Sequence, residues 1–206
     1  MPEPKMMTVD EYWSKSLADK CKSGYLNVCG DKYRVILEKL DQYNLKDAKI
    51  LEIGCGYCHF AFHYKWKDYT GLDISNVGLL HAQKHLPKAK FIHGELGMFK
   101  PKEKYDVILA LDSLEHIPLG WDEVSAIVDG SHSDTIFIGN VPLVRSNHQK
   151  HELIEHEMNE MILRKFLYKC RFFNIKSEIY LVAGIEKDLK VTMCPFLFFD
   201  AVKGLR

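Results

Sequence analysis

The chain has 206 residues, of which 47% are hydrophobic and 27% charged, and its 28 Lys and Arg residues balance its 28 Asp and Glu residues. These values predict one soluble globular domain, and the zero formal charge speaks against the basic surface with which proteins grip long nucleic acids. No apolar run approaches membrane-spanning length, and the first five residues contain no apolar signal core, so we expect a cytoplasmic protein without a membrane segment.

The region before residue 45 is expected to form a helical cover over the rest of the domain. Thr8-Val-Asp-Glu11 resembles a capping box that opens a helix to about residue 22, and the apolar spacing over Lys32–Asp41 indicates a second helix. We expect residues 1–206 to form one domain, with residues 46–206 as its core.

Strand-like and helix-like segments alternate through the middle of the chain. The expected strands are Ile50–Ile53, Tyr69–Asp73, Lys90–His93, Tyr105–Leu111 and Thr135–Ile138. The expected helices cover about Cys58–Trp66, a segment capped by Ser75 and ending at His85, a segment around Asp122–Val128, and about Asn159–Tyr168. This alternation predicts an α/β fold with a doubly wound, mostly parallel sheet.

The last part of the chain is β-rich. Two runs, Phe172–Val182 and Leu189–Phe199, are joined through Gly184 and have no helix between them. We expect them to pair as a hairpin, which places an antiparallel strand near one edge of a seven-stranded sheet. Gly139 is expected to begin a loop that carries Asn140 and Pro142.

A glycine-rich turn follows the first strand of the core. The apolar run Ile50–Ile53 ends at Gly54-Cys55-Gly56, where open α/β sheets bind nucleotide-like ligands. Glu52 precedes this turn, and Asp73 ends the next strand 21 residues later, where a ribose diol needs an acid. A dinucleotide fingerprint needs a third glycine where His59 stands, so an NAD site fits poorly.

The six cysteines are Cys21, Cys29, Cys55, Cys58, Cys170 and Cys194. Their spacing does not form a disulfide framework, so we expect reduced thiols. Cys55 and Cys58 form a C-x-x-C pair, but no second pair completes a zinc site, and Cys55 is expected to offer its backbone to a ligand rather than its thiol.

The pattern Glu52-x-Gly54-x-Gly56 resembles motif I of the class I S-adenosylmethionine-dependent methyltransferases, with Cys58 where the third glycine is usual. The resemblance extends in order through Gly71–Ser75, Phe91–Glu95 and the Leu-Glu-His segment that ends at His116, and it covers roughly residues 48–175. It implies a Rossmann-like fold and S-adenosylmethionine as the cofactor.

The resemblance also implies the residues of the cofactor site. Asp73 would hold the ribose hydroxyls, Ile74 would pack on the adenine, and Glu95 with the amide of Leu96 would meet the adenine edge. The full cofactor-binding set is Glu52, Gly54, Cys55, Gly56, Asp73, Ile74, Glu95, Leu96, Leu111 and Asp112.

The leading functional hypothesis is methyl transfer to a small-molecule acceptor. A general base is needed only for an acceptor of high pKa, and His116 and His156 are the candidates. Under this hypothesis no metal is expected, and the oligomeric state is left open.

Three alternatives remain. The first is an RNA 3′-terminal 2′-O-methyltransferase, in which Asp112, Glu115, His116 and one of His148, His151 or His156 would hold Mg²⁺ or Mn²⁺. The second is a binding subunit with the same fold and no catalytic activity, and the third is a nicotinamide oxidoreductase.

Overall fold

The computed structural model describes residue 15 and residues 30–43, 47–63, 66–143, 158–185 and 191–203. The helix expected to begin near Thr8 lies outside these ranges apart from Lys15, and the predicted candidates His148, His151 and His156 also lie outside them. In the described part of the chain, no helix combines the length and the apolar character that are needed to cross a membrane.

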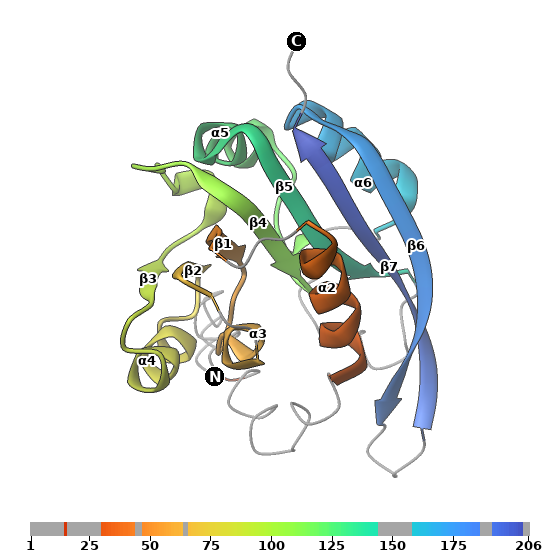
Figure 1. The fold of residues 1–206 in the computed structure, drawn as a ribbon, viewed down its shortest axis with the longest axis horizontal. Coiled ribbons are helices and arrows are strands. Elements are labelled where there is room, and N and C mark those ends of the chain that lie inside the picture. The colour runs from red at the N-terminus through yellow and green to blue at the C-terminus, as the bar shows by residue number, and fades with distance from the viewer. Residues whose placement is uncertain are drawn as a thin grey trace, which may run out of the picture.

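The centre of the fold is a seven-stranded sheet with the order β3-β2-β1-β4-β5-β7-β6. Its strands are β1 (Lys49–Ile53), β2 (Asp68–Asp73), β3 (Lys90–His93), β4 (Tyr105–Leu111), β5 (Ser131–Pro142), β6 (Phe172–Ile185) and β7 (Val191–Lys203). Strands β1 to β5 are parallel, and β7 is antiparallel to both of its neighbours, as its arrowhead in Figure 1 shows. The predicted Rossmann-like sheet with an antiparallel strand near one edge is confirmed.

Helices cover both faces of this sheet (Figure 1). One layer contains α2 (Gly30–Gln42), α3 (His59–His63) and α4 (Asn76–His85), and the other contains α5 (Trp121–Gly130) and α6 (Glu160–Lys169). Two short 3-10 helices, η2 (Leu96–Met98) and η3 (Leu114–His116), belong to the second layer. Because both faces are covered, the parallel strands read as continuous apolar runs and not as alternating ones.

Two sequence-based boundaries were wrong, and the ladders around β7 explain both. β5 continues through Asn140 to Pro142, where a loop was expected, because β7 pairs with this segment. Gly184 does not connect the last two strands but lies within β6, paired with Thr192. Pairing with the antiparallel strand β7 therefore makes β5 and β6 longer than their own sequences predict.

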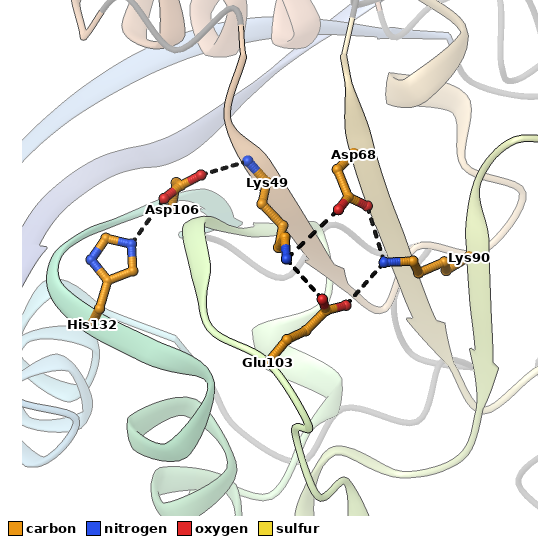
Figure 2. Close-up of polar contacts among 6 residues, drawn as sticks. All are labelled: Lys49, Asp68, Lys90, Glu103, Asp106 and His132. Atoms are coloured by element: carbon orange, nitrogen blue, oxygen red, sulfur yellow. Dashed lines mark hydrogen bonds and ion pairs between the residues drawn. The ribbon is translucent and has the colours of Figure 1, made fainter.

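A charged network ties together the strand starts at the amino edge of the parallel strands (Figure 2). Lys49 Nζ lies 2.8 Å from Glu103 Oε2, and Lys90 Nζ lies 3.1 Å from Glu103 Oε1. Asp68 completes the ring, 3.3 Å from Lys90 Nζ. The Lys49 amide also donates to Asp106 Oδ2 at 2.7 Å. The alternating charges hold β1, β2 and the β3–β4 connection in register at the edge opposite the glycine turn.

A buried polar cluster anchors α2 to β7. Lys39 Nζ lies 2.7 Å from Asp200 Oδ1, and both side chains are almost fully buried. The Tyr43 hydroxyl donates to the other oxygen of Asp200, and burial together with this hydrogen bond raises the pKa of Tyr43 well above its usual value. Because the ion pair is buried, it fixes the position of the helix along the strand more than it adds net stability.

Candidate functional site

The predicted site residues that the structure describes gather at the carboxyl edge of the parallel strands, around the point where the strand order reverses. β2 and β3 lie on one side of β1, and β4 and β5 lie on the other. Open α/β sheets bind ligands in the crevice at this switch point. The loops that follow β1, β2 and β4 therefore meet at the same place.

The turn after β1 lies directly against the turn after β4. Gly54 has a φ of +67°, and a Cβ atom added there would lie 2.5 Å from the Cβ of Ser113. The Ser113 hydroxyl donates to the carbonyl of Ile53 at 2.9 Å. Position 54 therefore requires glycine for both its conformation and its clearance. Ser113 was not predicted, because no sequence pattern reveals a contact between two loops 60 residues apart.

The amides of the glycine turn are already used within the chain. The amides of Gly54 and Cys55 donate to the carbonyl of Leu72 at 2.8 and 3.2 Å, and the amide of Gly56 donates to Asp73 Oδ2 at 2.7 Å. A pyrophosphate needs free amides pointing toward it. This turn is consequently suited to a ligand that lacks a pyrophosphate, which agrees with the weak dinucleotide fingerprint at His59.

Asp73 is held in a fixed orientation at the end of β2. Its Oδ2 accepts the Gly56 amide, and its Oδ1 accepts the Ser75 amide at 2.7 Å. The residue is 8% exposed. A carboxylate offers about four acceptor positions, so one that is anchored in this way can still receive hydroxyl groups of a ligand. Ser75 also accepts from the amide of Gly78, which confirms its predicted role as the cap of α4.

Glu52 is buried beneath the glycine turn, on the face of the sheet covered by α2 to α4. It is 3% exposed, and the hydroxyl of Tyr69 on β2 donates to it. Burial raises the pKa of the Glu52 carboxyl to about 8, although the hydrogen bond from Tyr69 opposes the shift and the charge of Asp73 adds to it. Tyr69 was not predicted, because its contact depends on the register between β1 and β2.

The two cysteines of the turn are packed inward. A Cβ atom on Gly71 would lie 2.7 Å from Cys55 Sγ and 3.3 Å from Cys58 Sγ, so the glycine in β2 makes room for both sulfurs. Both residues are buried, and burial raises the pKa of the Cys55 thiol well above its usual value, with a hydrogen bond from this thiol to Cys58 adding to the shift. A buried thiol of raised pKa is unreactive, so Cys55 serves packing, and the buried Cys58 packs beside it.

The predicted adenine-side residues lie beyond β2 and β3. Ile74 is half-buried, and its carbonyl lies 2.9 Å from His93 Nε2. Glu95 is exposed at the start of η2, whereas the side chain of Leu96 is buried in the core. Leu96 could therefore offer a ligand its backbone amide and not its side chain.

The ends of β4 and β5 are joined by a polar pair. Asp112 has a φ of +51°, which is unusual for a residue with a side chain. Its Oδ1 accepts from Nδ2 of Asn140 at 2.5 Å, and its amide donates to the Asn140 carbonyl at 3.3 Å. Asn140 is 1% exposed, whereas Asp112 and the neighbouring Leu111 are half-buried.

Glu115 and His116 follow in η3. His116 Nε2 lies 3.7 Å from Glu115 Oε1, and both side chains are largely buried. Within the described ranges, no group of three or more His, Cys, Asp or Glu residues is arranged to hold a metal ion. The second histidine of the metal hypothesis, and with it the candidate base His156, lies outside those ranges.

A family model described as "Methyltransferase domain" matches residues 28–167. Trans-aconitate 2-methyltransferase of Escherichia fergusonii is 27% identical over 107 residues, which is 50% of this chain and 42% of that protein. The chain thus matches less than half the length of such curated relatives.

Two solved structures share the fold. Phosphoethanolamine N-methyltransferase 2 of Haemonchus contortus, in complex with S-adenosyl-L-methionine, has a TM-score of 0.74 at 14% identity, over 98% of this chain and 61% of that one. An S-adenosylmethionine-dependent methyltransferase of Clostridium acetobutylicum has a TM-score of 0.62 at 15% identity, over 84% of this chain and 91% of that one.

Proposed function

The chain belongs to the methyltransferase-domain family and has the Rossmann-like fold of the S-adenosylmethionine-dependent methyltransferases, and from this premise we propose that it transfers the methyl group of S-adenosylmethionine to a small-molecule acceptor. The cofactor would lie along the carboxyl ends of β1, β2 and β3, and the acceptor would approach from above β4. The transferred group would pass between them at the switch point of the sheet.

The anchored carboxylate of Asp73 is the observation that carries this proposal. Two backbone amides, those of Gly56 and Ser75, orient it at the tip of β2. A ribose presents two neighbouring hydroxyl groups, and a carboxylate in a fixed orientation can accept both of them. The amides of the adjacent turn donate within the chain, which suits a nucleoside ligand without a pyrophosphate.

The chain's own residues would act mainly by position and charge. The cofactor supplies a methyl group that is electrophilic because its sulfur is positively charged. Asp73 would fix the nucleoside end, and Gly54 would let the ligand approach the backbone closely. Holding donor and acceptor in line converts a bimolecular reaction into an effectively unimolecular one. His116 is the candidate base for an acceptor that must lose a proton.

A small-molecule acceptor is supported by the balance of charges, 28 basic against 28 acidic residues, which offers no electrostatic footprint for nucleic acid. The relatives that resemble this chain carry names that point to small acceptors, trans-aconitate in one case and phosphoethanolamine in another. The acceptors in these two names differ in chemistry, since one is a carboxylate and the other is an amine.

A thermal-shift titration with S-adenosylmethionine, S-adenosylhomocysteine and NAD tests the cofactor. A ligand that binds only the folded state raises the melting temperature by mass action, so both adenosyl ligands should raise it and NAD should not. Asp73→Asn should weaken the response to both adenosyl ligands. Asp134→Asn is its matched control, because Asp134 is exposed at the opposite edge of the sheet. A response to NAD alone, or to none of the three, would contradict the proposal.

A further inference from the structure

Asp112 lies between the place proposed for the donor and the place proposed for the acceptor. It follows β4, on the side of the switch point away from β2 and β3. The next residue, Ser113, lies against Gly54 of the glycine turn, with the Ser113 hydroxyl 2.9 Å from the carbonyl of Ile53. Half-buried Asp112 therefore belongs to the loop that adjoins the turn that would hold the cofactor, and its side chain contacts Asn140 on the neighbouring strand β5.

The carboxylate of Asp112 has a fixed direction. Asn140, which is 1% exposed, donates its side-chain amide to Oδ1. The same two residues are joined through their backbones by the Asp112 amide and the Asn140 carbonyl. A residue with a side chain keeps a left-handed backbone conformation only where the surrounding structure enforces that conformation. The pair therefore presents a negative charge in a defined position at the carboxyl edge.

We propose that Asp112, oriented by Asn140, selects an amine as the methyl acceptor, and does not bind the cofactor as the resemblance implied. This inference rests on the proposed function. An amine nitrogen carries both a hydrogen to donate to the carboxylate and a lone pair to attack the methyl carbon. A carboxylate acceptor would bring a second negative charge beside Asp112, which is unfavourable in a partly buried site. For a hydroxyl acceptor an aspartate is too weak a base, so Asp112 would not select it, and its proton would have to pass to another base such as His116.

The transfer step balances without a further reagent. The amine, which is an ammonium ion in neutral water, first releases a proton to water. Its lone pair then forms the new N–C bond while the S–C bond breaks, and the sulfur keeps the electron pair of that bond and becomes a neutral thioether. The positive charge passes to the nitrogen, which then releases a proton to water. Asp112 would accept a hydrogen bond from the amine N–H and thereby direct the lone pair toward the methyl group.

The test compares amines and acids of matched skeleton on the full chain saturated with S-adenosylhomocysteine. The pairs are ethanolamine with glycolate, butylamine with butyrate, and benzylamine with benzoate. Binding is measured by ligand-observed NMR, and methyl transfer from S-adenosylmethionine is measured separately by mass spectrometry. We expect binding and methylation of amine members and none of their acid counterparts.

Asp112→Asn is the decisive variant. Asparagine tolerates the left-handed conformation and keeps the size of the side chain, so the fold should persist. Loss of a charged hydrogen-bond partner should weaken amine binding about ten- to hundredfold. Asp134→Asn, the same change at the opposite edge, should leave it unchanged. Asn140→Ala tests the positioning role, and we expect it to raise the KM for the amine more than it lowers kcat.

The outcomes separate this inference from the proposed function. If the wild-type chain does not bind S-adenosylhomocysteine, the proposed function itself fails. If it binds that ligand but prefers the acids, or binds neither class, the inference fails and the proposed function stands. Amine binding that Asp112→Asn leaves intact would also overturn the inference.

Discussion

Glu52→Gln should change how the stability of this protein depends on pH. The folded state keeps the proton of Glu52 up to a pKa of about 8, whereas the unfolded chain loses it near 4.5. Between these values the folded state binds one proton more than the unfolded state, so the free energy of unfolding falls as the pH rises. The slope is about 1.4 kcal/mol per pH unit, or about 2–3 kcal/mol between pH 5.5 and 7.5.

The variant lacks this titration, because an amide of nearly the same shape replaces the carboxyl and can still accept from Tyr69. Its stability relative to the wild type should therefore rise by about 2–3 kcal/mol between pH 5.5 and 7.5. Denaturant unfolding at both pH values measures this difference, and the contributions of the other titrating groups cancel between the two proteins.

Glu38→Gln on the exposed face of α2 is the matched control, since Glu38 is half-exposed and forms an ion pair with Arg34 on its own helix. It should leave the pH dependence close to that of the wild type. Parallel pH dependences for the wild type and Glu52→Gln would refute the reasoning, because they would mean that Glu52 is already ionised in the folded state at pH 5.5.

Three further predictions concern the site and the core. Gly54→Ala should lower the free energy of unfolding by about 1–3 kcal/mol, because a Cβ there meets Ser113 and the backbone is left-handed; Ser113→Gly should restore part of this loss in denaturant titrations, and no loss would argue against the contact. Asp200→Asn should cost about 3–5 kcal/mol by removing the near counter-charge of buried Lys39, whose other carboxylate neighbour, Glu178, is half-exposed and 3.9 Å away; the double variant with Lys39→Met should cost less, and additive losses would contradict the pairing. Asp73→Ala should weaken S-adenosylmethionine binding at least about tenfold in calorimetry while circular dichroism stays unchanged; an unchanged affinity would mean that the cofactor lies elsewhere.

The sequence was sufficient to predict the parallel half of the sheet and several of the residues that lie at its carboxyl edge. Ile50–Ile53 is an uninterrupted apolar run because β1 is covered on both faces, and the run ends where Gly54 must adopt a left-handed conformation. Asp73 could be placed at the tip of β2 because it ends the next apolar strand. These features are local, since each depends on the covering of one strand or on the conformation of one turn.

Features that depend on pairing between distant segments could not be predicted. Asn140 was expected in a loop, but β7 pairs with it and extends β5. The bond from Tyr69 to Glu52 depends on the register of two strands, and the contact of Ser113 with Gly54 depends on how two loops meet. Their residue types are ordinary at those positions, so neither composition nor periodicity distinguishes them before the fold is known.

The insertion of β7 between β5 and β6 has a consequence for synthesis on the ribosome. The final strand of the sheet to be made is an interior one, and its Asp200 is the counter-charge for Lys39, 161 positions earlier. Until that strand emerges, the long edges of β5 and β6 lack their shared partner, and a nascent chain that displays such edges is open to association with other chains. The seven-stranded sheet of this protein can thus close only after β7 has been made and has entered between two strands that precede it in the chain.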